Sequence, residues 1–231
     1  MINRFKSTNS FFVSYLCLVA VSFAYYFYQS HGNFVLWLNE LHNPIWDFFF
    51  KYWTHSGGAP FFIVITIYLL IRKKRFAHIL SLVGISVGLI SVFFKQILFA
   101  DVMRPSKYFE GQATIFPIDG VDLLEYHSFP SGHSMTAFAL ATFLVLMLQN
   151  NKYSIVILIL ATLTALSRVY LGQHFLLDVV AGSLIGTIIA TIYYMSFEKY
   201  LNNERLGPAS TPDKDLEEMN LDDIEPSEEA L

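Results

Sequence analysis

Apolar and polar stretches alternate along the chain in blocks, and six of the apolar blocks are 14 to 24 residues long. A helix of about 20 mainly apolar residues is long enough to cross the hydrocarbon core of a membrane. The pattern therefore predicts an all-α fold, a multi-pass membrane bundle of about six transmembrane helices. The predicted spans are residues 11–29, 58–71, 76–99, 134–148, 153–167 and 176–197.

The composition is that of a membrane protein. Of the 231 residues, 54% are hydrophobic and 15% are charged, which is more apolar than a soluble domain of this size requires. The first apolar block, 11–29, also has features of a signal peptide. It is longer than the usual signal-peptide core and no clear small-residue cleavage site follows it, so we expect an uncleaved span. Cys17 is the single cysteine, and no disulfide can form within the chain.

The distribution of positive charge predicts the orientation of the bundle. Residues 72–75 are four consecutive cations in a short loop without acidic side chains. Such loops face the cytoplasm. Counting six spans from this loop places both termini in the cytoplasm, together with Arg4, Lys6 and Lys152. In the inner membrane of a bacterium, the location that we expect, the outer face is periplasmic. The polar segments on that face are residues 30–56, 101–132 and 171–174.

Two further segments differ in composition from the spans. Residues 30–56 contain all three tryptophans among charged residues, which is typical of an interfacial segment that packs against the bundle. Residues 202–231 hold ten acidic and two basic side chains, a net charge of −8, whereas residues 1–201 carry +4. We expect residues 1–201 to form the membrane domain and residues 202–231 a disordered acidic cytoplasmic tail.

Two pairs of glycines lie four residues apart inside predicted spans. They are Gly84 with Gly88, and Gly182 with Gly186. Small residues at this spacing let the backbones of two membrane helices approach closely. Both pairs therefore predict close helix packing and not a ligand site.

One polar cluster lies between the fifth and sixth spans and contains Arg168, His174 and Asp178. If the chain is helical from Phe175 onward, His174 and Asp178 face the same way. The carboxylate can then hold one imidazole nitrogen as a donor and leave the other lone pair free to attack. Arg168 offers a planar fork suited to phosphate oxygens. The alternative is a membrane helix ending in polar anchors, but ionisable groups at such a boundary are costly and usually functional.

A second cluster, residues 129–134, directly precedes the fourth span. Ser131 and Gly132 leave backbone N–H groups open at the start of a helix, which is a ready anion site. Gly132 also permits close approach of a ligand, and His133 adds a titratable proton donor. The alternative interpretation is an ordinary helix cap.

A third cluster consists of Lys95 and Arg104, the latter followed by Pro105. Lys95 lies near the outer end of the third span, where its long stem can extend outward. Taken alone, the two cations are also consistent with interface anchors.

Together the three clusters supply three cations, an anion-binding helix start, two imidazoles and an orienting carboxylate. This set is suited to phosphoryl transfer through a phosphohistidine, in which Lys and Arg neutralise the phosphate charge without a protein-held metal. The sequence contains no clustered Cys or His ligands, no Walker loop and no outer-face pair of carboxylates arranged for a metal. We therefore expect neither a metal nor a cofactor.

The sequence resembles the phosphatidic acid phosphatase type 2 family, which includes membrane lipid phosphatases and is distantly related to vanadate haloperoxidases. The family pattern is Lys-x6-Arg-Pro, then Pro-Ser-Gly-His, then Ser-Arg-x5-His-x3-Asp. The second motif is complete at residues 130–133, and the third at Ser167, Arg168, His174 and Asp178. In the first motif eight residues, not six, separate Lys95 from Arg104, and the turn after the helix can absorb the extra two. The resemblance covers roughly residues 60–195.

The resemblance implies a role for each site residue. His174 is the nucleophile, Asp178 orients it, and His133 protonates the leaving oxygen. Phosphate is bound by Lys95, Arg104, Ser131, Gly132 and Arg168. The family fold is a helical bundle, with six spans in its integral-membrane members, which agrees with the number of apolar blocks.

These observations favour a metal-independent lipid phosphatase acting on a phosphomonoester or pyrophosphate at the outer leaflet. The candidate substrates are undecaprenyl pyrophosphate, phosphatidylglycerol phosphate, phosphatidic acid and lipid A phosphate, and the sequence does not choose among them. A lipid phosphotransferase and a non-catalytic lipid-binding protein stay open as alternatives, although both motif histidines are present. A haloperoxidase is disfavoured because those relatives are soluble. The expected partners are a lipid phosphate and the bilayer, not nucleic acid, and the oligomeric state is not indicated.

Overall fold

The computed structural model describes residues 8–205, and every regular element in this part of the chain is helical. The predicted all-α class is therefore confirmed. A 3₁₀ turn, η1, and a π-helical turn, η2, interrupt the α-helices. The elements are α2 (Asn9–Tyr28), α3 (Asn33–Glu40), α4 (Pro44–Trp53), η1 (Thr54–Gly57), α5 (Ala59–Arg72), α6 (Lys74–Phe93), η2 (Phe94–Leu98), α7 (Pro105–Tyr108), α8 (Gly132–Leu148), α9 (Asn151–Tyr170), α10 (Leu176–Ser196) and α11 (Glu198–Arg205).

Each of the six predicted spans coincides with one of these helices. Four helical stretches are long and apolar enough to cross a membrane: α2, α6 with η2, α9 and α10. α5 has 14 residues and meets the α4–η1 segment at a bend of 54°. α8 is apolar but has 17 residues. The count of six spans therefore stays a prediction, whereas the bundle of apolar helices is present.

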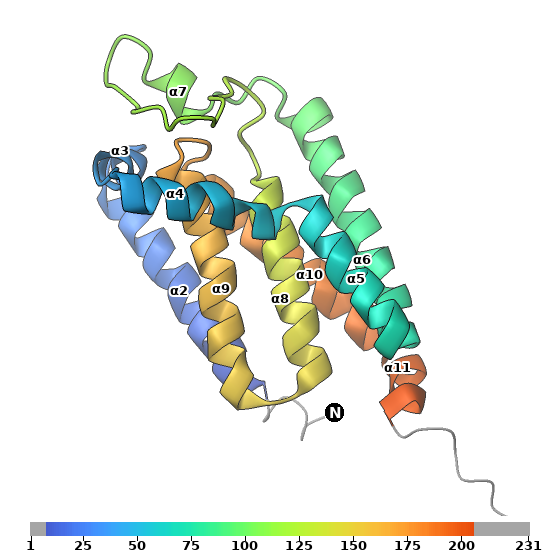
Figure 1. Cartoon of the computed structure of the whole chain (residues 1–231). Coiled ribbons are helices and arrows are strands. Elements are labelled where there is room, and N and C mark those ends of the chain that lie inside the picture. Colours follow the sequence, from blue (N-terminus) through green and yellow to red (C-terminus); the bar gives the residue numbers. More distant parts are fainter. Residues whose placement is uncertain (1–7, 206–231) are drawn as a thin grey trace, which may run out of the picture. The chain divides into compact units, whose positions relative to one another are not determined.

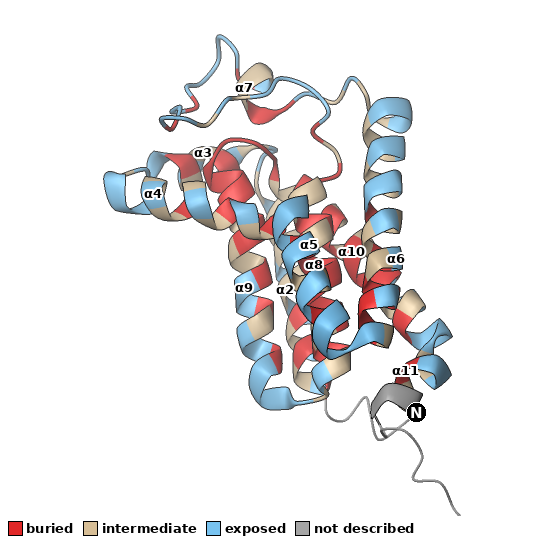
Figure 2. Cartoon of the chain, turned by 45° about the vertical axis from the view of Figure 1, so that its right-hand side comes forward, coloured by how far each residue is buried: buried red, intermediate tan, exposed pale blue. Residues whose placement is uncertain are grey.

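The helices are arranged around α8, α9 and α10. α2 packs against α9 and α10, while α5 and α6 pack together beside α8 (Figure 1). α8 is largely buried, whereas α2, α5 and α6 each expose an apolar face (Figure 2). The exposed side chains on these faces include Leu16, Ile63, Ile67, Ile85 and Leu89. A helix of a soluble protein buries its apolar face, so these outward faces suit contact with lipid tails.

The polar segments gather at one end of the bundle. α3, α4, α7 and the turn between α9 and α10 lie there, while the α5–α6 and α8–α9 turns lie at the opposite end (Figure 1). The three segments predicted to share the outer face are thus together.

The predicted interfacial segment forms α3, α4 and η1 across that polar end (Figure 1). α4 begins where the side chain of Asn43 caps it and Pro44 occupies its first turn. Its Phe50 packs against Tyr170 with ring centroids 4.5 Å apart and the rings tilted by 37°, and its Asp47 accepts a hydrogen bond of 2.5 Å from the Tyr170 hydroxyl. The opposite face of α4 exposes Ile45, Phe48 and Tyr52. The segment therefore packs against the bundle as predicted and keeps a second apolar face outward.

The two glycine pairs behave differently. Helices α8 and α10 meet at Gly182 and Gly186, where an added methyl group would collide with the backbone of α8. Gly84 of α6 contacts the ring of Phe62 on α5. At Gly88, in contrast, a methyl group would meet nothing within 4 Å. The prediction of close packing is therefore wrong at Gly88, because α5 and α6 diverge there and leave open space.

α11 belongs to a second unit, which begins at Glu198. It runs to Arg205, so the first four residues of the predicted tail are helical. The rest of the predicted acidic tail, 206–231, lies outside the described residues, as do Arg4 and Lys6.

Candidate active site

His174 lies in the turn between α9 and α10 and is 1% exposed. Its Nδ1 is 3.4 Å from Oδ2 of Asp178, a distance within ion-pair range, although the angle is not that of a hydrogen bond. The same oxygen accepts hydrogen bonds from the Phe175 N–H at 2.9 Å and from the Ser128 hydroxyl at 2.5 Å. These two donors fix the carboxylate beside the imidazole.

The physical basis of this pairing differs from the prediction. A helix from Phe175 onward was to place His174 and Asp178 on one face, but α10 begins at Leu176 and Phe175 is its N-cap. Asp178 occupies the third helical position and reaches back to cap the Phe175 N–H, which also brings it beside His174. The capping geometry, and not the helical repeat, therefore joins the two side chains.

Arg104 is 4% exposed and holds three parts of the chain together. Its guanidinium donates to four oxygens at 2.8–3.3 Å. They are the carbonyl oxygens of Tyr126, His127 and Gln173 and the side-chain oxygen of Gln173. Gln173 in turn donates to the carbonyl of Asp122 at 2.9 Å. Arg104 therefore ties the outer loop to the turn that carries His174.

A fifth contact of Arg104 favours one tautomer of His174. Nη1 of Arg104 lies 3.4 Å from Nε2 of His174. A guanidinium has donors and no acceptor, so Nε2 is the acceptor and holds a lone pair. The proton of the neutral imidazole is then on Nδ1, facing Asp178. This is the tautomer that a nucleophile attacking through Nε2 requires.

The charges around His174 favour the neutral imidazole. Burial lowers the pKa of His174 well below its usual value of 6.5, and Arg104, Arg168 and Lys95 lower the pKa further through their positive charge. Burial also lowers the pKa of Arg104, but a guanidinium keeps its charge in proteins. The site therefore combines an uncharged imidazole with surrounding cations.

Arg168, near the end of α9, is buried and has fewer contacts than Arg104. Its Nη1 donates to the hydroxyl of Thr54 at 2.8 Å. Its Nε has no partner within residues 8–205. Arg168 thus keeps N–H donors available to an anion.

Lys95 lies on the π-helical turn η2, which widens the end of α6. A methyl group added to Gly132 would be 3.8 Å from Lys95 Nζ, so the ammonium faces the start of α8. The wider turn accommodates part of the longer spacing between Lys95 and Arg104. The structure therefore brings both cations of the first motif to the same site.

The start of α8 forms the anion cradle. Ser131 is its N-cap and accepts a hydrogen bond from the Ser134 N–H at 3.4 Å. The Ser131 N–H itself donates to the carbonyl of Asp178 at 3.0 Å. The first-turn N–H groups of Gly132 and His133 are the donors that stay open. Pro130 lies outside the helix, directly before the cap.

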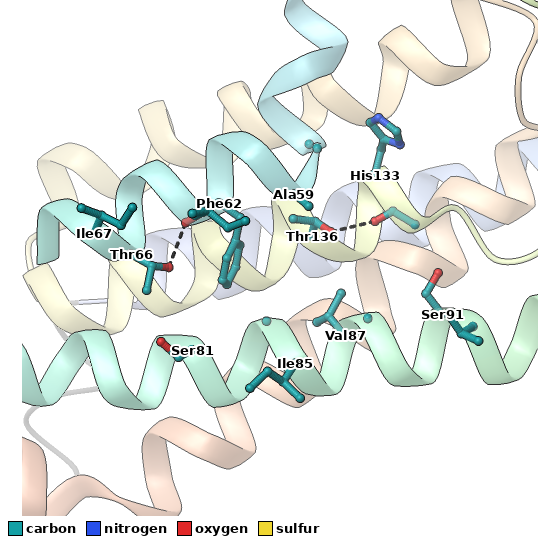
Figure 3. A pocket seen from close by; sticks show the side chains of 17 residues that line it. Ala59, Phe62, Thr66, Ile67, Ser81, Ile85, Val87, Ser91, His133 and Thr136 are labelled. Carbon is teal, nitrogen blue, oxygen red and sulfur yellow. Dashed lines mark hydrogen bonds between the residues drawn. The ribbon is translucent and has the colours of Figure 1, made fainter. Parts of the chain in front are cut away.

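A groove of about 690 Å³ leads from this cradle along the space between α5 and α6 (Figure 3). Gly132, His133 and Ser91 line its polar end, while Ile67 and Ser81 lie at the other end. Ser81 and Ser91 are ten positions apart, which corresponds to about 15 Å of helix, about half of a ~30 Å hydrocarbon core.

The lining of this groove is apolar. Two of its hydroxyls bond to carbonyls of their own helices: Thr66 to Phe62 and Thr136 to Gly132 (Figure 3). Ser81 donates in the same way to Ala77. Ile63, Ile67 and Ile85 line the groove and are each more than half exposed, so it opens sideways toward the region where lipid would lie. The groove is therefore suited to an acyl chain.

Three polar residues of the site were not predicted from the sequence. Ser128 and Gln173 lie beside or inside the motifs, where their position is a usable signal. Thr54 lies in the predicted interfacial segment, and nothing in its local sequence connects it with Arg168. Within the described part of the chain, no three His, Cys, Asp or Glu side chains are grouped in a way that could hold a metal ion.

Comparisons with known proteins cover the part of the chain that carries the site. Residues 76–201, which include all eight predicted site residues, match the model of the PAP2 superfamily. A lipid A 4'-phosphatase of Bacteroides thetaiotaomicron is 28% identical over 172 residues, covering 71% of this chain and 76% of that protein.

Two solved structures have a similar fold. The crystal structure of Aquifex aeolicus LpxE has a TM-score of 0.60 at 26% identity and covers 71% of this chain and 94% of that one. A transmembrane PAP2-type phosphatidylglycerolphosphate phosphatase from Bacillus subtilis has a TM-score of 0.59 at 25% identity and covers 84% of this chain and 97% of that one.

Proposed function

The chain belongs to the PAP2 superfamily, and from this premise we propose that it is a metal-independent lipid phosphatase working through a phosphohistidine at His174. One observation carries the proposal: the charged cradle and the apolar groove meet at Gly132 and His133. A substrate with a phosphate at one end and an acyl chain at the other fits such a junction. A site for a small soluble phosphate needs no groove of this kind.

In the proposed reaction, Nε2 of His174 attacks the phosphorus atom opposite the lipid oxygen. The N–P bond forms as the P–O bond breaks, and His133 gives a proton to the leaving oxygen. Water then attacks the phosphorus of the phosphohistidine while His133 takes its proton, and the N–P bond breaks, which releases inorganic phosphate and restores the lone pair on Nε2. Asp178 keeps the proton on Nδ1 and stabilises the positive charge that the imidazole gains.

The phosphate oxygens are proposed to contact Lys95, Arg104, Arg168 and the open N–H groups of the cradle. Ser131 accepts from Ser134 through its hydroxyl oxygen, which leaves its own O–H to donate to phosphate. Preorganised donors of this kind stabilise the charge that develops as phosphorus is transferred. We expect activity to persist in EDTA and to be inhibited by orthovanadate, which mimics the trigonal-bipyramidal transition state.

We propose a lipid A phosphate as the first substrate to test, because two relatives that match over 71% and 81% of this chain are named lipid A 4'-phosphatases. Phosphatidylglycerol phosphate is the second, from the name of the Bacillus structure. Undecaprenyl pyrophosphate and phosphatidic acid complete the panel. A phosphotransferase is separated from a phosphatase by the release of inorganic phosphate.

The test uses purified protein with each lipid of this panel in EDTA. Wild-type protein is expected to release inorganic phosphate from at least one lipid, and His174→Ala from none. No release from any lipid, or release that requires an added divalent ion, would contradict the proposal. His133→Ala is expected to keep more activity on p-nitrophenyl phosphate than on the lipid, because the aryl group leaves without help from a proton donor. For the lipid, a poor leaving group, the proton donor contributes about 10²–10⁴-fold to the rate.

We also propose that the site faces the periplasm of a bacterial inner membrane, with both termini in the cytoplasm. The support is the run of cations at residues 72–75, at the end of the bundle opposite to the site. A cysteine at the exposed Gln112 is expected to react with an impermeant reagent added from outside, and a tag after Leu231 to be accessible from the cytoplasm. Labelling of both from one side would contradict this topology.

A further inference from the structure

The 3₁₀ turn η1 contributes to the site although it lies outside the stretch that matches the family model. A methyl group on its Gly57 would be 2.8 Å from the carbonyl oxygen of His133 and 3.0 Å from its Cβ. Its Thr54 is buried and accepts the hydrogen bond from Arg168. η1 therefore lies in contact with both His133, the proposed acid, and Arg168, a proposed phosphate-binding cation.

We propose that Thr54 is a positioning residue that sets the plane of the Arg168 guanidinium against the phosphate. The inference rests on the proposed phosphatase function. A guanidinium recognises phosphate through pairs of parallel N–H groups, so its orientation decides how well it binds. The hydrogen bond to Thr54 uses Nη1 and leaves Nε, which has no protein partner in residues 8–205, to the phosphate.

The contrast with Arg104 explains why this one contact matters. Arg104 has four protein oxygens around its guanidinium and keeps its orientation if one is lost. Within residues 8–205, the Arg168 guanidinium has one side-chain hydrogen-bond partner, the Thr54 hydroxyl. Thr54 is itself held, because η1 is anchored to α9 by a second hydrogen bond of 2.7 Å between Ser56 and Thr164.

This second anchor provides a matched control. Thr54→Val keeps the shape of the side chain and removes the hydroxyl. Thr54→Ser keeps the hydroxyl. Ser56→Ala removes a hydrogen bond between the same turn and the same helix, but one that does not involve Arg168. The three variants separate orientation of Arg168 from a general loosening of η1.

The first measurement is binding of orthovanadate by purified protein, read as the ligand-induced rise in thermal unfolding temperature. Thr54→Val is expected to bind vanadate about 10- to 100-fold more weakly, the range for loss of a hydrogen bond to a charged group. Thr54→Ser and Ser56→Ala are expected to bind like the wild type. Equal affinity in Thr54→Val, or an equal loss in Ser56→Ala, would overturn the inference.

The second measurement is a double-mutant cycle with Arg168→Gln. If Thr54 acts through Arg168, Thr54→Val has no further effect on vanadate affinity once Arg168→Gln is present. A full additional loss in the double variant would overturn the inference. Vanadate binding does not depend on turnover, so the two proposals can fail separately. If the wild type binds vanadate but releases no phosphate from any lipid, the proposed function is refuted. The vanadate affinities of the variants then still decide whether Thr54 orients Arg168.

Discussion

The two glycine pairs of the bundle have the same spacing and opposite structural roles. At Gly182 and Gly186 the backbones of α8 and α10 are in direct contact, and a methyl group on Gly182 would be 2.5 Å from the carbonyl oxygen of Ser131. At Gly84 and Gly88, α6 meets one aromatic ring and then an open groove. One pair closes an interface, and the other leaves space.

This difference corresponds to the two halves of the site. The closed α8–α10 interface joins the Ser131 N–H to the carbonyl of Asp178, so it fixes the cradle against the residue that lies beside His174. The open α5–α6 side provides the apolar groove that ends at the cradle. In the proposed function, the closely packed region binds the phosphate and the open region has room for the lipid chain.

The largest expected effect comes from filling the closed pair. In Gly186→Ala the new methyl group overlaps the carbonyl of Met135, and the two helices must separate. We expect the free energy of unfolding to fall by about 1–3 kcal/mol or more. Gly88→Ala has free space and gains helix propensity, so it is expected to be neutral or up to about 1 kcal/mol more stable. Thermal unfolding in detergent measures both, and equal shifts would contradict the comparison.

The next largest effect is expected in Gly88→Leu, which should lower activity on a lipid substrate but not on an aryl phosphate. Gly88→Leu is expected to fill the groove without disturbing the cradle, so kcat/KM for a lipid phosphate falls at least about tenfold, the equivalent of two displaced CH₂ groups. Activity on p-nitrophenyl phosphate is expected to be unchanged, because that substrate has no acyl chain. Gly88→Ala is the control, with both activities near wild type. An equal loss on both substrates would indicate that the residue acts on the cradle instead.

The sequence motifs predicted the residues of the site better than the glycine spacing predicted the packing of the helices. The eight residues of the three clusters all lie around one site in the structure, because short motifs carry residue types that chemistry requires. The glycine spacing misled at Gly88, since spacing alone does not reveal whether a partner helix lies alongside. Thr54 could not be found either, because its contact with Arg168 joins residues 114 positions apart. The hydrogen bond from the Phe175 N–H to Asp178 was also not predicted, although capping by an acidic residue in the first helical turn is a local signal.

A smaller effect is expected at Gly84, which is intermediate between the two pairs. A methyl group there would be 2.6 Å from Cε1 of Phe62, a ring edge that can rotate away. Gly84→Ala is expected to cost about 1 kcal/mol, less than Gly186→Ala. The same thermal unfolding series measures it. A cost as large as that of Gly186→Ala would mean that α5 and α6 are packed as rigidly as α8 and α10.

The smallest expected effect is a shift in the pH dependence of kcat/KM, which we expect for a variant near His174 but not for variants of the groove. Because the pKa of His174 in the folded protein is well below 6.5, its imidazole stays unprotonated as the pH falls through 6.5, and its contribution to the acid limb of kcat/KM lies well below that value. Arg104→Gln removes one of the charges that lower this pKa, so the acid limb is expected to move to higher pH. Burial, the larger cause, is retained, and the shift is therefore partial.

Groove variants provide the control for this profile. Gly88→Ala and Gly88→Leu leave the charges around His174 in place, so their acid limb with p-nitrophenyl phosphate is expected to match that of the wild type. Comparison with one substrate also cancels the ionisation of the substrate itself. An acid limb in Arg104→Gln that is unchanged or moves to lower pH would contradict the electrostatic account.

The central claim, that cradle and groove are one catalytic site built on His174, is tested most directly by trapping the phosphoenzyme. Wild-type protein and Gly88→Leu are mixed with a lipid phosphate or with p-nitrophenyl phosphate, quenched in alkali and mapped for acid-labile phosphate. We predict phosphate on His174 from both substrates in the wild type. In Gly88→Leu, labelling by the aryl phosphate is expected to be unchanged, and labelling by the lipid to be at least about tenfold slower. Phosphate on His133, or equal labelling of Gly88→Leu by the lipid, would contradict the claim.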